Sequence, residues 1–207
     1  MAYVRSQLVR GADAMARGGA RGWGWYHRSL EKMNAAAPAV AFLDVSIGGA
    51  PSERVVVELA KDVVPKTVEN FTLMCTKGFE SAFGAGSFKN SVFHNITKGT
   101  YIVGGDVLAG DGTGGHAALE KGKRFFEDEN FALQFSEEGV IGMANAGVNK
   151  NASQFFIALK PLPHLNGRNV AFGKIVDGKS VLKNIEAVYC VQGKPVTEVK
   201  ITDCGLL

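Results

Sequence analysis

The side chains best suited to metal or nucleophile chemistry in this 207-residue chain are three cysteines and four histidines. They are Cys75, Cys190, Cys204, His27, His94, His116 and His164. Because none of them forms a CxxC pair or the short Cys/His spacing that binds zinc, the sequence predicts no metal site. Gly112-Thr113-Gly114-Gly115 is glycine-rich, but the Lys-Ser/Thr of a phosphate loop does not follow it. A GxSxG elbow is also lacking, so nothing indicates a hydrolase or a nucleotide-binding enzyme.

The elements that would position a site are mostly short strands. Residues 43–47 alternate apolar and polar side chains, and Val55, Val57 and Leu59 fall on one face of a second strand. Further short apolar runs occur at 92–94, 101–103, 140–143, 154–159, 170–175 and 199–202. Many short strands combined with few helices predict a mainly β fold, a closed or nearly closed barrel.

Two segments show helical periodicity instead. Pro65 suits the first turn of a helix, and the apolar residues after it recur at helical spacing, which predicts a helix near 65–76. Val181, Ile185 and Val188 predict a second helix near 178–188. The residues expected to be buried in the core are Leu43, Val45, Val57, Phe71, Met143, Phe155 and Phe172.

The charge of the chain is concentrated at its start. Residues 1–40 hold six basic residues and two acidic ones, a net charge of +4 against +3 for the whole chain. We therefore divide the chain into a basic, Arg/Gly/Ala-rich arm over residues 1–39 and a near-neutral domain over residues 40–207. No apolar run reaches the roughly 18 residues that a membrane helix needs, so no membrane span is expected.

Several blocks of the domain resemble the cyclophilins, and they follow in family order. They are Val64-Pro65-Lys66-Thr67-Val68-Glu69-Asn70-Phe71, Phe93-His94-Asn95-Ile96, Gly104-Gly105-Asp106, Gly112-Thr113-Gly114-Gly115, Phe126-Glu127-Asp128-Glu129-Asn130-Phe131, Met143-Ala144-Asn145-Ala146-Gly147, Ser153-Gln154-Phe155-Phe156-Ile157, Val170-Ala171-Phe172-Gly173 and Ile201-Thr202-Asp203-Cys204-Gly205. The resemblance covers roughly residues 40–207. It implies a closed, eight-stranded antiparallel β-barrel capped by two α-helices, and the ancestry of a peptidyl-prolyl cis-trans isomerase that uses no cofactor.

The resemblance also identifies where the chain departs from the family. Asn95 stands at the position of the catalytic arginine that stabilises the twisted imide, and Val103 stands where a glutamine helps to hold that arginine. Thr100 replaces an aromatic residue of the proline pocket, and Asn169 replaces a histidine. We interpret Asn95 as non-functional and Thr100, Val103 and Asn169 as degenerate. These changes favour weak or lost isomerase activity.

Other positions match the family residues that bind a peptide backbone or line the proline pocket. The resemblance implies peptide binding by Tyr101, Ala144, Asn145, Gln154, Phe156, His164 and Leu165, where Tyr101 replaces a methionine and His164 a tryptophan. Ordinary packing remains an alternative for Phe156 and Leu165, as does loop bracing for Asn145 and Gln154. Two stretches longer than in the shortest relatives, between Phe71 and Phe93 and from His116 to Lys123, are expected to form surface loops.

Two functions from different classes remain open. One is an accessory or structural subunit of a larger mitochondrial assembly, with degenerate isomerase activity, and the other is an active isomerase that assists protein folding. The arm resembles a mitochondrial targeting segment, with a cytoplasmic or ciliary location as the alternative. Its Trp23, Trp25 and Arg28 are expected to dock on protein subunits of a complex, more than on RNA. The domain is expected to bind proline-containing peptide, and cyclosporin only weakly.

Overall fold

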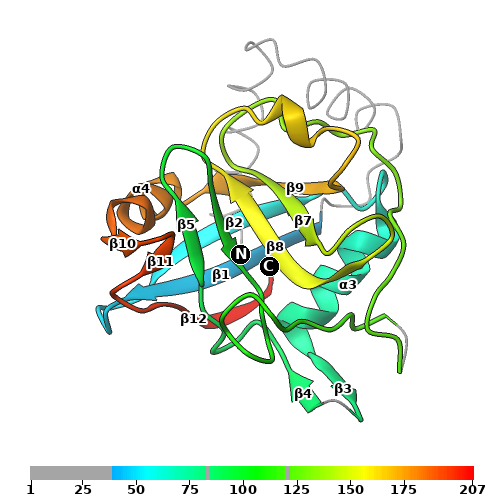
Figure 1. Cartoon of the computed structure of the whole chain (residues 1–207), viewed down its shortest axis with the longest axis horizontal. Coiled ribbons are helices and arrows are strands. Elements are labelled where there is room, and N and C mark those ends of the chain that lie inside the picture. Colours follow the sequence, from blue (N-terminus) through cyan, green and yellow to red (C-terminus); the bar gives the residue numbers. More distant parts are fainter. Residues whose placement is uncertain (1–38, 83, 120–121) are drawn as a thin grey trace.

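The computed structural model describes residues 39–82, 84–119 and 122–207. The predicted docking residues Trp23, Trp25 and Arg28 lie outside these ranges. Within them the chain is mainly β, with a large antiparallel sheet that curls on itself and one α-helix on either side of it (Figure 1).

The large sheet contains eight strands in the order β12-β1-β2-β9-β7-β8-β6-β5. Their bounds are β1 (Ala39–Ile47), β2 (Glu53–Leu59), β5 (Asn95–Thr97), β6 (Tyr101–Gly104), β7 (Val140–Asn145), β8 (Asn151–Ala158), β9 (Ala171–Asp177) and β12 (Val199–Leu206). All its paired strands are antiparallel. The predicted mainly β architecture is confirmed.

The two edges of this sheet are joined by the chain segment that precedes β5. The Asn90 N–H donates to the Ile201 carbonyl at 2.7 Å, and the Phe93 N–H donates to the Val199 carbonyl at 2.8 Å. Ile201 returns a bond from its N–H to the Ser91 carbonyl at 2.9 Å. The strand expected at 92–94 is therefore displaced: β5 begins at Asn95, and the residues before it close the barrel against β12.

The helices α3 (Pro65–Thr76) and α4 (Lys179–Ala187) form where the periodicity predicts them. Pro65 occupies the start of α3, where its missing N–H costs nothing. The carboxylate of Glu129, distant in sequence, accepts the N–H groups of Lys66 at 3.0 Å and Thr67 at 2.8 Å. The first N–H groups of a helix have no partner within the helix. Two of them here donate to a carboxylate, whose negative charge also lies at the positive end of the helix dipole.

The barrel interior and the inner faces of both helices form one apolar core. Phe71 on α3 is 1% exposed and contacts the rings of Phe88, Phe155 and Phe172 at centroid distances of 5.1, 5.4 and 5.1 Å. All seven residues predicted to be buried are at most 2% exposed. The alternation along the strands therefore identified the core side correctly.

Two small hairpins were not predicted. They are β3–β4 (Phe79–Ser81 and Gly84–Gly86) and β10–β11 (Cys190–Val191 and Lys194–Pro195). The first lies in the longer stretch after α3 and packs against the second such stretch: the rings of Phe79 and His116 stack at 4.5 Å with an interplanar angle of 4°. His116 and Ala117 are buried. The expectation that 116–123 is a surface loop is wrong at its start, because the two long stretches cover each other.

Candidate functional site

Four neighbouring strands contribute one residue each to a row across the sheet. Asn95 on β5 pairs with Val103 on β6, and Val103 pairs with Phe156 on β8. Phe156 in turn pairs with Gly142 on β7. Directly opposed residues of antiparallel strands share a face of the sheet, so three predicted site residues lie side by side.

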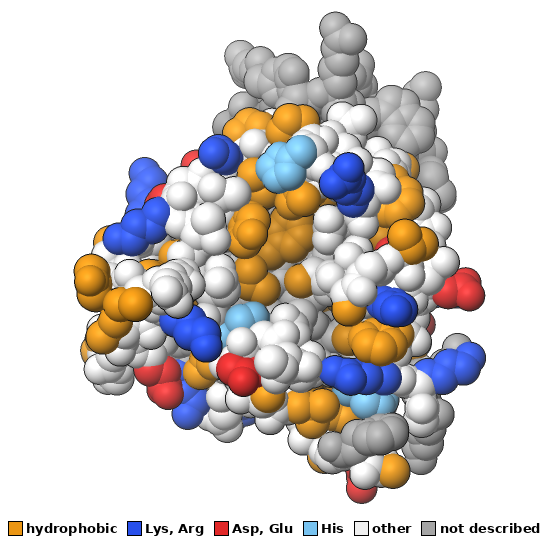
Figure 2. Space-filling view, in the orientation of Figure 1, with side chains coloured by type: hydrophobic (Ala, Val, Ile, Leu, Met, Phe, Trp, Pro, Cys, Tyr) orange, Lys and Arg blue, Asp and Glu red, His pale blue; other side chains and the backbone are white. Residues whose placement is uncertain are grey.

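The middle of this row is an apolar floor made of aromatic rings. Phe156 is 4% exposed and contacts the rings of Tyr101 and Phe135 at 5.9 and 5.1 Å. A Cβ atom on Gly142 would come within 2.5 Å of the Phe135 ring, so only glycine permits this packing. Leu165, on the 3-10 helix Pro163–Leu165, is half-buried against the same core. Figure 2 shows apolar side chains gathered in a hollow in the middle of this face.

Asn95 is engaged by its own surroundings. Its Oδ1 accepts a hydrogen bond from the Thr97 hydroxyl at 3.2 Å. Its Nδ2 lies only 2.7 Å from where a Cβ on Gly193 would be, and the Gly193 carbonyl accepts the Ile96 N–H at 2.8 Å. The short, neutral carboxamide is therefore enclosed between its own strand and the turn of the β10–β11 hairpin. It brings no positive charge to the apolar floor.

The other substituted positions are structural in their contacts. Thr100 lies in the β5–β6 turn, where its N–H donates to the Thr97 carbonyl at 2.9 Å. Val103 is half-buried against the core and offers neither donor nor acceptor. Asn169 donates from Nδ2 to the Met143 carbonyl at 2.9 Å, which ties the segment after the 3-10 helix to β7. His164 is exposed on the 3-10 helix.

Two of the residues with the retained pattern, Ala144 and Asn145, form the end of β7. The β7–β8 register is interrupted between Met143 and Asn145, and the β9 partners of β7 extend only to Gly142, so Ala144 has no partner in either register. An interruption of this kind in a strand ladder is a place where an extended peptide can add to a sheet. Asn145 Nδ2 donates to the Arg168 carbonyl at 2.8 Å. These contacts brace the neighbouring loop around the open position.

Gln154 binds a glycine-rich loop. Its Nε2 donates to the Gly112 and Gly114 carbonyls at 3.0 and 2.7 Å. The loop is shaped from inside by Asp106, a buried carboxylate that sequence analysis did not single out. Burial alone would raise the Asp106 pKa, but backbone N–H donors outweigh it and lower this pKa to about 2. Those donors are the N–H groups of Ala109, Gly114, Gly112 and Leu108.

Replacing Asp106 with asparagine should destabilise the fold by about 2–4 kcal/mol at pH 7, because an amide group would face backbone donors that need an acceptor. The Asp106 pKa is lower in the folded chain than the ordinary value of 3.8, so its contribution is complete above that value. The difference between wild type and D106N should shrink as the pH falls toward about 2. Urea unfolding at several pH values measures it.

The matched control is Asp111→Asn in the same loop. The Asp111 carboxylate is exposed and accepts hydrogen bonds from the N–H and the hydroxyl of Thr113 in its own turn. This variant should change the unfolding free energy much less than D106N does. Equal losses in both variants would contradict the assigned role of Asp106.

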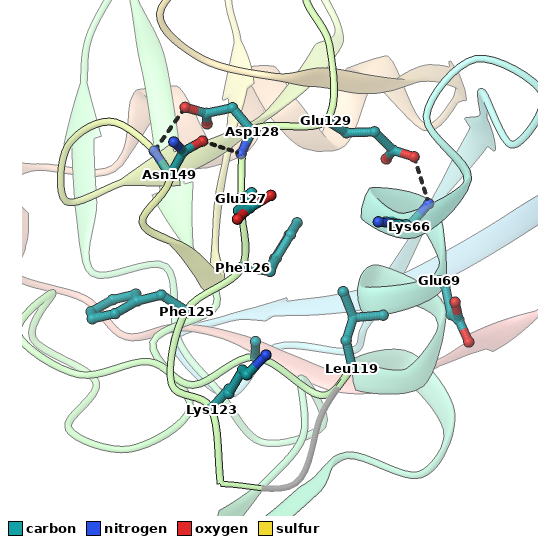
Figure 3. A pocket seen from close by; sticks show the side chains of 11 residues that line it. Lys66, Glu69, Leu119, Lys123, Phe125, Phe126, Glu127, Asp128, Glu129 and Asn149 are labelled. Carbon is teal, nitrogen blue, oxygen red and sulfur yellow. Dashed lines mark hydrogen bonds between the residues drawn. The ribbon is translucent and has the colours of Figure 1, made fainter.

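A cavity of about 870 Å³ lies apart from these residues, between α3 and residues 117–119 and 123–129 (Figure 3). Two of its acidic residues already hold the fold together: Glu129 caps α3, and Asp128 exchanges hydrogen bonds with Asn149 at 2.9 and 2.8 Å. None of the predicted site residues lines it. We therefore take the apolar floor and its surroundings as the candidate site.

Two further properties of the described residues bear on function. No set of three or more His, Cys, Asp or Glu side chains among them is arranged to hold a metal ion. No helix within the described ranges has the length and apolarity to cross a membrane.

Comparison with known proteins agrees with this geometry. A family model described as "Cyclophilin type peptidyl-prolyl cis-trans isomerase/CLD" matches residues 42–206. A protein of Kluyveromyces lactis named "Peptidyl-prolyl cis-trans isomerase D" is 44% identical over 173 residues, which cover 80% of this chain and 45% of that protein. The chain belongs to the cyclophilin family. It spans less than half the length of this curated relative.

Proposed function

We propose that the chain is a cyclophilin domain that binds extended, proline-containing segments but isomerises them slowly, and that it serves as an accessory subunit of a larger mitochondrial assembly. The observation that supports slow turnover is the environment of Asn95, a neutral side chain enclosed by Thr97 and Gly193. Rotation about a peptide bond has a barrier of about 18–20 kcal/mol. Lowering it requires interactions that strengthen in the twisted transition state, and Asn95 supplies no charge for that.

Peptide binding is supported by the other half of the site. Phe156 and Tyr101 offer an apolar floor for a proline ring, and Ala144 lies at an unpaired strand position beside it. Extended peptides that add to an open strand gain backbone hydrogen bonds without any catalytic step. Cyclosporin should bind weakly at most, since Thr100, Val103 and Asn169 alter the pocket that the family uses.

The second candidate function is an active isomerase that assists folding. It is favoured by the retained Ala144, Gln154 and Phe156, and by the name of the 44% identical relative. Titration of the full chain with a short proline peptide, followed by NMR, tests binding and turnover together. Chemical-shift changes at β7 and β8 with negligible exchange between cis and trans signals would support the proposal. Strong catalysed exchange would favour the second candidate.

The basic arm supports the assembly part of the proposal. Deleting residues 1–38 should leave the barrel folded, because the described core is built from residue 40 onward. The same deletion should abolish mitochondrial localisation or the association with a complex, as measured by epitope tagging and size-exclusion chromatography of cell extracts. Substituting Trp23, Trp25 and Arg28 together with alanine separates docking from targeting. Unchanged localisation and association after the deletion would refute the role of the arm.

A further inference from the structure

A fixed arginine stands beside the glycine-rich loop of the site. Arg124 donates from Nε to the Gly115 carbonyl at 3.1 Å and from Nη2 to the Thr113 carbonyl at 3.2 Å. Its guanidinium also lies over the Phe125 ring, 5.1 Å from the centroid. Arginine has five N–H donors in a rigid fork. The donors not used in these two bonds have no acceptor among the described residues, and Arg124 itself is exposed.

The same loop connects Arg124 to the apolar floor. Gln154 binds the carbonyls of Gly112 and Gly114, which alternate along the loop with the two carbonyls that Arg124 binds. Gln154 and Phe156 are two residues apart on β8, so their side chains share a face of the sheet about 7 Å apart. An extended peptide with its proline on the floor would reach Arg124 after about two to four residues.

The two carboxylates of this loop bind other groups and do not pair with the guanidinium of Arg124. Asp106 is buried under backbone donors, and Asp111 is bound to the backbone and hydroxyl of Thr113. Figure 2 shows basic side chains around the apolar hollow and few acidic ones on the same face. A ligand with a negative charge near the loop would therefore meet a preorganised guanidinium.

We propose that Arg124 makes this face select proline-containing segments that carry Asp or Glu about two to four residues from the proline, on the Gln154 side. A carboxylate accepts parallel N–H bonds from a guanidinium fork, which adds geometric selection to charge attraction. Arg124 is thus a specificity-determining residue. The inference rests on the proposed peptide binding, because it names the class of peptide that the proposed site takes.

The test uses the full chain and a panel of alanine-rich peptides with one central proline. Glutamate is placed at each position in turn on both sides of the proline, and each peptide has a glutamine twin as a neutral control. Fluorescence anisotropy at low salt should show binding about two- to fivefold tighter for glutamate than for glutamine, at positions on one side of the proline only. Added salt should reduce this difference.

The variant Arg124→Gln should remove the glutamate preference, so that each glutamate peptide binds no tighter than its glutamine twin. Lys98→Gln, which removes the same charge from the β5–β6 turn, should keep the preference. A preference that survives R124Q, or equal binding of both peptides of every pair, overturns the inference while peptide binding stands. If no peptide of the panel binds, the proposed function itself fails and this inference fails with it.

Discussion

The full chain should accelerate the cis-trans isomerisation of a proline peptide at least about a hundredfold less than a cyclophilin with the arginine in place, measured in the same assay. The expected loss follows from Asn95, which is neutral, short and hydrogen-bonded to Thr97. Removing one donor aimed at a transition-state charge costs enzymes about 10²–10³ in rate. Uncatalysed isomerisation takes tens to hundreds of seconds, so a protein-free blank must run beside each measurement.

Restoring the missing groups makes the test sharper. The double variant Asn95→Arg with Val103→Gln places a charged and a hydrogen-bonding side chain on paired positions of β5 and β6. It should gain isomerase activity, whereas Asn95→Gln with Val103→Gln, which adds length without charge, should not. Near-normal turnover by the wild type would contradict the proposal. No gain from the restored variant would locate the loss in the pocket, at Thr100, Tyr101 and Asn169.

The variant Phe71→Ala should lower the free energy of unfolding by about 3–5 kcal/mol. Phe71 contacts the Phe88, Phe155 and Phe172 rings between α3 and the barrel, so truncation loses transfer free energy and leaves a cavity. Guanidinium unfolding followed by circular dichroism measures this loss. Its size would be a large share of the total stability of a domain.

Phe131 provides the matched control for this substitution. It has the same side chain but is 39% exposed, and it stands outside the apolar core. Phe131→Ala should therefore cost clearly less than Phe71→Ala. If the two variants unfolded at the same denaturant concentration, Phe71 would not hold α3 to the barrel as the structure indicates.

Much of the fold follows from local patterns in the sequence. Alternation placed Leu43 and Val57 in the core, and Pro65 with the apolar spacing after it predicted α3 at its observed bounds. These signals work because burial of one face imposes a period on strand and helix alike. The two small hairpins carry no such signal, since strands of two or three residues cannot show alternation. The prediction that His116 lies in a surface loop was wrong for a related reason. Its ring is buried against Phe79, which is far away in the sequence.

The sequence alone identified the family, and it predicted which site residues differ from the family pattern, because both depend only on residue types in a fixed order. Only the tertiary structure revealed how those residues are held. Asn95 meets Gly193 across nearly half the chain, and Gln154 and Arg124 meet on the same loop through carbonyl groups that every residue type possesses. The direction of a backbone carbonyl cannot be predicted from residue types alone. Here it depends on the turns of the loop, which Asp106 and packing hold in place. The residue types of this candidate site could therefore be predicted from the sequence. Its geometry depends on contacts between segments that are distant in the sequence.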